Sequence, residues 1–140
     1  MSASLIAALC CTVLLLVTTA YFLLGSIPLL ELQHDTPLDA RFVRGFFNTY
    51  YLAAMVVAGA AAASYAWAGT LGFALGAAAL ALLAAAMRRA IIPMMDRLRT
   101  QIPTAGAQAI RQFRRAHLSA IAVNLIQLAL IVWCLVAFPL

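Results

Sequence analysis

The sequence has little charge, and it has no lysine. Only 9% of its 140 residues are charged, its basic residues are all arginines, and acidic residues number four. Hydrophobic residues make up 66% of the chain, which is more than a water-soluble domain of this length needs for one core. These proportions exclude an ordinary water-soluble domain and predict an integral membrane protein.

Several catalytic and metal-binding motifs are also missing. The chain contains no glycine-rich phosphate loop, no HExxH and no GxSxG. Its three cysteines, Cys10, Cys11 and Cys134, form no CxxC pair, so a zinc site is not indicated. An oxidising compartment would permit a disulfide between the first and last apolar segments, although cysteines inside a span more often pack as small apolar residues. An enzyme is therefore less favoured than a non-enzymatic protein.

Four apolar segments are long enough to cross a bilayer, at about residues 5–30, 46–67, 71–92 and 115–138. The first segment has no basic residues before it, so we interpret it as a retained span and not as a signal peptide. Its end should kink or stop near Pro28. The sequence predicts an all-α protein, with residues 1–140 forming one four-helix transmembrane bundle.

Local signals place the ends of the second helix. Thr36, Pro37 and Asp39 have the order of an N-cap, a first-turn proline and an acidic third residue, so this helix should begin near Pro37. Residues 68–70 are short and uncharged. They predict a tight antiparallel hairpin of the second and third helices.

The third helix carries a GxxxG pair and a proline. We expect Gly72 and Gly76 to pack against the small residues of the second helix. Pro93 should break or bend the helix. A loop is then expected at residues 102–106, with the last helix starting near Ala107.

The distribution of charge predicts the orientation in the membrane. Every arginine, acidic residue and histidine lies within residues 31–45 or 88–117, and four spans place both regions on one side. The positive-inside rule makes that side cytoplasmic, with both termini outside, and Trp67 and Trp133 fall at the opposite, outer ends of their helices. The arginines should then contact lipid headgroups, and we expect no nucleic-acid partner. The expected location is a bacterial inner membrane.

Three polar side chains interrupt the last apolar segment. His117, Asn124 and Gln127 are separated by seven and three residues, so one helix places them on one face. Unpaired polar groups are costly in hydrocarbon, so this face should meet other helices or a ligand. We predict a cytoplasm-facing, ligand-binding pocket lined by these residues, with His34 reaching in from the first connection.

Two interpretations of this polar face stay open. Asn124 and Gln127 are favoured as interhelical hydrogen-bonding groups, worth about 0.6 to 2 kcal/mol each, over ligand contacts. His34 and His117 have the chemistry to ligate a haem, another pigment or a transition metal. Interfacial histidines more often bond headgroups, water or helix ends, so the cofactor and any metal are left unassigned.

The pattern FRRAHLSAIAVNL, preceded by IIPMMDRLR, resembles the last two helices of a family of small four-helix membrane proteins of unknown function. That family includes a eukaryotic TMEM-type protein linked to drug resistance. The resemblance extends over residues 88–133 and is carried by Pro93, Arg99, Phe113, His117, Ser119 and Asn124. It implies a four-helix membrane fold and brings no established activity.

A second resemblance is to the cofactor-free anthrone oxygenase group, which also has four helices. It rests on the similar placement of Asn48 and Pro93. It implies a small membrane oxidoreductase.

Three functions follow from these observations. The first is a non-enzymatic accessory or helix-packing subunit, whose partners would be the lipid bilayer and other membrane subunits or further copies of the chain. It is favoured by small-residue helix faces and by the lack of paired acid and base groups within the spans. The second is a binder or carrier of a small hydrophobic ligand or haem in a pocket on the last helix. The third is a small membrane oxidoreductase.

Overall fold

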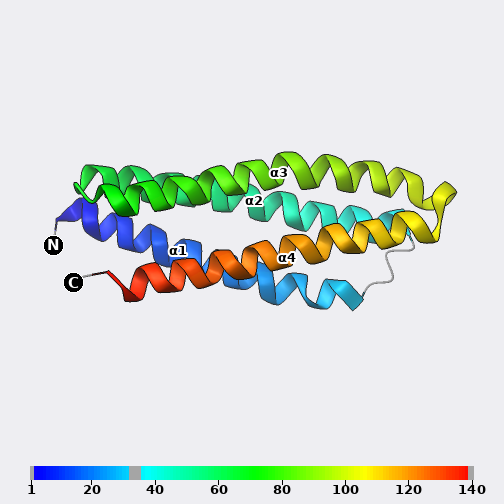
Figure 1. The fold of residues 1–140 in the computed structure, drawn as a ribbon, viewed down its shortest axis with the longest axis horizontal. Coiled ribbons are helices and arrows are strands. Elements are labelled where there is room, and N and C mark those ends of the chain that lie inside the picture. Colours follow the sequence, from blue (N-terminus) through cyan, green and yellow to red (C-terminus); the bar gives the residue numbers. More distant parts are fainter. Residues whose placement is uncertain (1, 32–35, 139–140) are drawn as a thin grey trace.

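The computed structural model describes residues 2–31 and 36–138. These form four long helices, α1 (Ala3–Ser26), α2 (Pro37–Trp67), α3 (Leu71–Ala105) and α4 (Ala107–Val136), with a short 3-10 helix, η1 (Pro28–Glu31), after α1. The helices pack as an elongated bundle, and α1 begins at the same end of the bundle as α4 finishes (Figure 1). Each of the four is long and apolar enough to cross a membrane. The predicted all-α four-helix bundle is confirmed.

The ends of α1 and α2 lie close to where local signals placed them. The Thr36 hydroxyl accepts a hydrogen bond from the Asp39 N–H at 3.2 Å, and Pro37 occupies the first turn of α2. This arrangement satisfies one of the free N–H groups at the helix start. Helix α1 finishes at Ser26, and the chain continues from Pro28 as η1.

Residues 68–70 connect α2 and α3 in a tight turn, as predicted. Gly69 has a φ angle of 77°, a conformation that glycine adopts at little cost because it has no Cβ. The N–H and the hydroxyl of Thr70 both donate to the Tyr65 carbonyl, at 3.0 and 3.1 Å. These contacts fix α2 and α3 as an antiparallel hairpin.

The prediction that Gly72 and Gly76 bring the hairpin together was wrong. Both glycines are exposed, and a Cβ added at either would meet no atom within 4 Å, so neither position is a site of close helix packing. The buried small residues of the two helices are alanines, namely Ala40, Ala54, Ala58, Ala61, Ala74, Ala77 and Ala84. In a helix with small residues on every side, the sequence does not show which face points inward.

Helix α3 also continues through Pro93, where the sequence predicted a break or a bend. It runs through Pro93 and Pro103 to Ala105, and Gly106, with a φ angle of 48°, makes the turn into α4. Both prolines are exposed, so their rings and missing N–H groups lie outside the core and do not disturb its packing. The loop predicted at residues 102–106 was therefore wrong.

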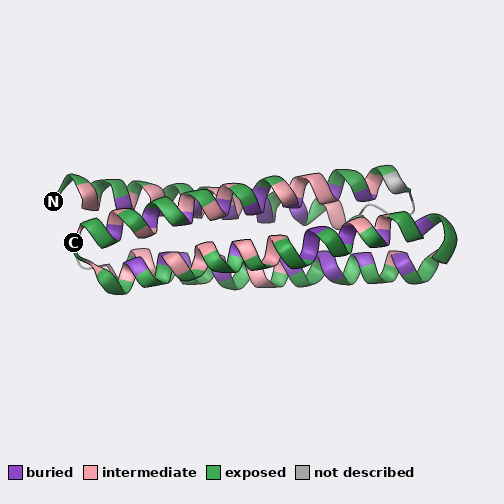
Figure 2. Cartoon of the chain, turned by 90° about the horizontal axis from the view of Figure 1, so that it is seen from above, coloured by how far each residue is buried: buried purple, intermediate pink, exposed green. Residues whose placement is uncertain are grey.

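Aromatic side chains fill the middle of the bundle. Phe22 of α1 stacks on Tyr50 of α2, with ring centroids 4.0 Å apart, and meets Phe47 edge-on at 4.9 Å. Such pairs stabilise a fold by about 0.5 to 1.5 kcal/mol each beyond their burial. Buried residues recur along the inward sides of the helices, and exposed ones cover the outside (Figure 2). The core thus holds α1 and α2 in a fixed relation.

Gly25 is required by the close approach of α1 to α2. A Cβ at this position would lie 2.7 Å from Phe46 Cζ, and the Phe46 ring is held by stacking on Phe22 at 5.4 Å. We expect Gly25→Ala to lower the free energy of unfolding by about 1 to 2 kcal/mol. Circular dichroism during SDS titration of the detergent-solubilised protein measures this change.

Two further variants serve as controls for Gly25→Ala. The substitution should cost less in a Phe46→Leu background, where the ring that causes the clash is gone. Gly59→Ala should cost nothing, because a Cβ at Gly59 meets no atom within 4 Å. Equal losses at Gly25 and Gly59 would contradict this explanation.

Candidate functional site

His117, Asn124 and Gln127 share one buried face of α4, with exposed fractions of 0%, 0% and 3%. The structure therefore brings together the three polar residues that the helical spacing placed on one face. His34 lies outside the described residues, so its part in the site stays a prediction.

Asn124 lies at the centre of a hydrogen-bonded cluster that joins three helices. Its Oδ1 accepts a hydrogen bond from the Tyr50 hydroxyl of α2 at 2.9 Å, and its Nδ2 donates to the Ala120 carbonyl at 2.8 Å. The Thr19 hydroxyl of α1 lies 3.4 Å from the Tyr50 hydroxyl. Interhelical bonding is thus the role that the contacts of Asn124 support. Sequence reasoning found Asn124 but missed Tyr50 and Thr19, which look like ordinary residues of apolar spans.

His117 connects α4 to the end of α1. Its Nε2 lies 3.1 Å from the Ser26 carbonyl oxygen, and its ring meets Phe47 edge-on with centroids 5.0 Å apart. A carbonyl only accepts hydrogen bonds, so this contact places the proton on Nε2. Ser26 is the last residue of α1, where carbonyls lack partners within the helix. The imidazole supplies such a partner.

This geometry does not fit ligation of haem or a metal by His117. The Nε2 atom of His117 is engaged by the Ser26 carbonyl, and in this arrangement it has no lone pair to offer an iron or another metal ion. In the part of the chain that the structure describes, no three His, Cys, Asp or Glu residues are grouped so as to hold a metal ion. We therefore derive no chemistry through such a cofactor.

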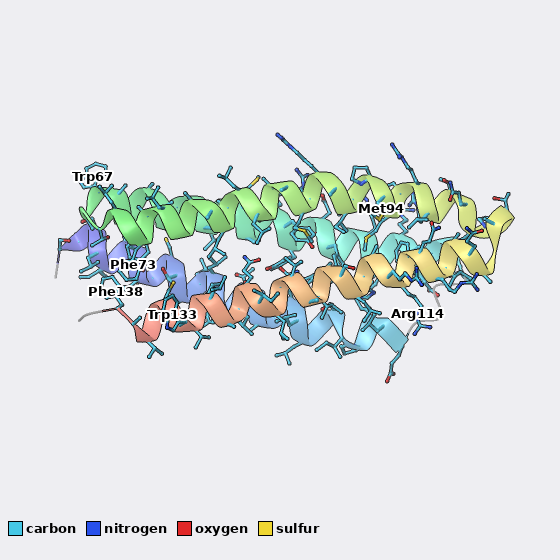
Figure 3. All side chains as sticks on the ribbon, in the orientation of Figure 1. Trp67, Phe73, Met94, Arg114, Trp133 and Phe138 are labelled. Atoms are coloured by element: carbon cyan, nitrogen blue, oxygen red, sulfur yellow. The ribbon has the colours of Figure 1, made fainter. Side chains whose placement is uncertain are left out.

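An apolar cavity of about 450 Å³ lies between the helices, near the end of the bundle where α1 begins. All four helices line it, through Thr12, Leu15, Ala61, Tyr65, Gly72, Phe73, Gly76, Ala77, Ala79, Leu80, Leu130, Ile131, Trp133 and Cys134. Phe73 and Trp133 mark its position between α3 and α4 in Figure 3. The cavity is distinct from the predicted pocket, because His117, Asn124 and Gln127 do not line it.

The cavity wall has few polar groups. The hydroxyls of Thr12 and Tyr65 are hydrogen-bonded to each other at 2.9 Å, and Thr12 also donates to the Ala8 carbonyl at 2.8 Å. Cys134 contributes a free thiol. Gly72 and Gly76 leave space because they have no side chains. Their GxxxG spacing was the one sequence signal at this site, and it was interpreted as helix packing.

A buried amide lies one helical turn from this cavity. Gln127 precedes Ile131, which lines the cavity, by four residues, and its Nε2 has no hydrogen-bond partner among the described residues. The hydroxyl of Tyr51 lies near Asn124 but likewise lacks a hydrogen bond within the described part of the chain. Leaving such a buried polar group unpaired costs about 1 to 3 kcal/mol. The part of the core next to the cavity is therefore not optimised for stability alone.

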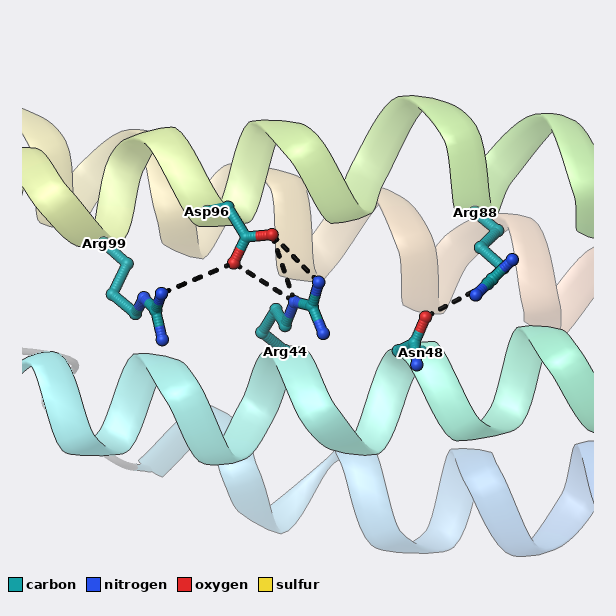
Figure 4. Close-up of polar contacts among 5 residues, drawn as sticks. All are labelled: Arg44, Asn48, Arg88, Asp96 and Arg99. Carbon is teal, nitrogen blue, oxygen red and sulfur yellow. Dashed lines mark hydrogen bonds and ion pairs between the residues drawn. The ribbon is translucent and has the colours of Figure 1, made fainter.

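Charged side chains gather between α2 and α3 toward the other end of the bundle (Figure 4). Arg44 donates to Asp96 through Nε at 3.1 Å and Nη2 at 2.9 Å, and Arg99 Nη2 lies 3.7 Å from the same carboxylate. Deeper in the bundle, Arg88 Nε donates to Asn48 Oδ1 at 3.0 Å. Sequence reasoning treated these arginines as topology signals. It did not predict that the Asp96 carboxylate forms ion pairs with two of them, Arg44 and Arg99.

Compared with protein-family models, with curated proteins and with solved structures, the chain shows no match in any of the three. The resemblance over residues 88–133 therefore stays a prediction. What the described residues establish is a membrane-type helical bundle with a hydrogen-bonded polar core, an apolar cavity at one end and a cluster of charges toward the other.

Proposed function

We propose that this chain binds a small apolar molecule of the bilayer in the cavity between its four helices. The observation that carries the proposal is the cavity itself, about 450 Å³ and lined from all four helices. Protein interiors are packed densely and leave few voids larger than a water molecule. Ligand pockets typically measure about 300 to 1,000 Å³ and are mostly apolar, so the cavity has the size and character of one.

The lining residues indicate the chemistry of the ligand. Tyr65, Phe73 and Trp133 supply aromatic walls, and the hydroxyl pair of Thr12 and Tyr65 offers one place for a hydrogen bond. Among the described residues, no charged side chain lines the cavity. The best fit is an apolar chain or ring system that carries at most one uncharged polar group.

The cavity is open toward the membrane. Gly72, Gly76 and Trp133 line it and are also exposed on the outside of the bundle. A molecule dissolved in the hydrocarbon would therefore enter between α3 and α4 without passing through water. This favours binding or carriage of a membrane-soluble compound over catalysis on a water-soluble substrate.

Filling the cavity tests the proposal. A Cβ at Gly76 meets no atom within 4 Å, so Gly76→Leu should fold and place its side chain in the ligand space. We expect mass spectrometry of solvent extracts to find an apolar molecule with the wild-type protein. Gly76→Leu should reduce that molecule about tenfold, equivalent to about 1.4 kcal/mol of lost affinity.

Gly59→Leu is the matched control for Gly76→Leu. Gly59 also lies in an alanine-rich helix with open space around it, but it does not line the cavity. Its substitution should leave the bound molecule unchanged. If the wild type and Gly76→Leu carry the same molecules in the same amounts, the cavity is not a ligand site.

A second candidate function is a helix-packing subunit of a larger membrane assembly. It is favoured by one observation, that Gly72 and Gly76 are exposed with open space where a Cβ would lie, although GxxxG pairs suit close helix contact. Native mass spectrometry from mild detergent separates the two candidates. A 14.9 kDa chain with a bound small molecule supports the first, and a larger protein complex that Gly76→Leu dissociates supports the second.

We also propose that the arginine-rich end of the bundle faces the cytoplasm of a bacterial inner membrane, with both termini outside. The support is the segregation of all nine arginines from the two tryptophans. The arginines lie toward one end of the bundle, and Trp67 and Trp133 lie toward the other.

A further inference from the structure

We propose that the cleft lined by Arg41, Arg44 and Arg99 binds the phosphate group of an anionic phospholipid. This site is independent of the proposed apolar ligand, because it lies between α2 and α3 toward the opposite end of the bundle from the cavity. The shape of the cleft, its charge and its depth along the helices all fit such a headgroup.

The cleft is accessible and has room for a headgroup. It measures about 390 Å³ and is lined by Arg41, Arg44, Gly45, Asp96 and Arg99. The side chains of Arg44 and Arg99 are 32% and 31% exposed, so both are held partly within the protein but can be reached from outside. Gly45 contributes no side chain, and a Cβ there would meet nothing within 4 Å, which leaves the wall beside the arginines open.

The hydrogen-bonding donors of the cleft are only partly used. Asp96 holds Arg44 in place through two nitrogens, whereas its 3.7 Å contact with Arg99 is too long for a hydrogen bond. Arg41 has no hydrogen bond or ion pair with any described residue. The lining thus contains three guanidinium groups and one carboxylate, and the cleft has a net positive charge. Guanidinium groups bind phosphate oxygens through paired N–H donors, which is the chemistry left free here.

The depth of the cleft favours a phospholipid as the source of the phosphate. Arg44 and Trp67 are 23 residues apart on α2, or about 34 Å at 1.5 Å per residue. The hydrocarbon core of a bilayer is about 30 Å thick, so with Trp67 at one interface Arg44 lies just beyond the hydrocarbon on the other side. Phospholipid phosphates occupy that depth. In the proposed orientation they belong to the cytoplasmic leaflet, which carries anionic lipids.

Native mass spectrometry of the full-length protein in mild detergent tests the site, with phosphatidylglycerol and phosphatidylcholine as probes. We expect Arg41→Gln/Arg99→Gln to weaken phosphatidylglycerol binding about tenfold. The matched control is Arg111→Gln/Arg115→Gln, which removes the same charge from exposed positions on α4. It should retain the binding. Circular dichroism confirms that each variant is folded.

Gly45→Leu provides a second test that leaves all charges in place. It fills the cleft, and we expect it to weaken phosphatidylglycerol binding to a similar extent, with phosphatidylcholine binding weak throughout. Millimolar inorganic phosphate should not displace the lipid. Equal losses in the two arginine double variants would show diffuse charge attraction and overturn the site. Retained binding in Gly45→Leu, or displacement by inorganic phosphate, would also overturn it.

Discussion

Replacing His117 with alanine should lower the free energy of unfolding by about 3 kcal/mol, the largest loss expected for a single side chain on α4. Two contributions combine in this loss. The change removes a completely buried ring that packs on Phe47, and it takes away the hydrogen-bond partner of the Ser26 carbonyl. SDS titration followed by circular dichroism measures the effect.

Gln112→Ala is the control for His117→Ala, because Gln112 lies on the same helix but is exposed. It should change stability by less than about 0.5 kcal/mol. If both variants unfold together with the wild type, His117 does not link α4 to α1, and the proposed structural role is wrong.

Asn124→Leu is expected to cost about 2 kcal/mol. The leucine fits an apolar helix, but the Tyr50 hydroxyl loses the acceptor that it reaches at 2.9 Å. A buried donor without a partner costs more than the same position made wholly apolar. We therefore expect Asn124→Leu in a Tyr50→Phe background to cost clearly less than it does in the wild type.

This double-mutant cycle measures the coupling between α2 and α4. A coupling of about 1 kcal/mol between Tyr50 and Asn124 would match their hydrogen bond. Additive losses would mean that the two side chains contribute independently, in contradiction to the hydrogen bond seen between them.

The helices and the polar face of α4 could be predicted because their signals are local. The N-cap at Thr36 depends on residues three positions apart, and the hairpin turn depends on residues 68–70. His117, Asn124 and Gln127 were found from the helical period alone. Each inference needs only the geometry of one helix or one turn.

The partners of these residues depend on contacts between distant parts of the chain. Tyr50 and Asn124 are 74 residues apart in sequence, and Arg44 and Asp96 are 52 apart. Tyr50 is an ordinary residue in an apolar span, so nothing in the sequence marked it as a donor. Without knowledge of which helix faces which, the charge cluster was indistinguishable from a set of topology signals.

The errors on α3 have two physical origins, one for its glycines and one for Pro93. Alanine and glycine occur on all sides of its first half, so hydrophobic periodicity does not define an inward face. Gly72 and Gly76 proved to line a cavity, and Pro93 proved to be exposed, where a helix tolerates it. The cavity was missed because the sequence did not show which face of α3 points inward.

Helix joining and ligand binding, which the sequence placed on one face of α4, are assigned to two different regions of the bundle. His117 and Asn124 join helices in the core, whereas ligand binding is proposed for the apolar cavity between α3 and α4. Substitutions in the two regions should therefore affect different properties of the protein.

The most direct test of this separation is ligand occupancy, measured by native mass spectrometry on folded wild type, Asn124→Leu and Gly76→Leu under the same mild conditions. We predict that Asn124→Leu is less stable but keeps the bound apolar molecule, whereas Gly76→Leu is stable and loses it. Loss of the molecule from Asn124→Leu, with full retention in Gly76→Leu, would place the ligand on the polar face of α4 and contradict the account.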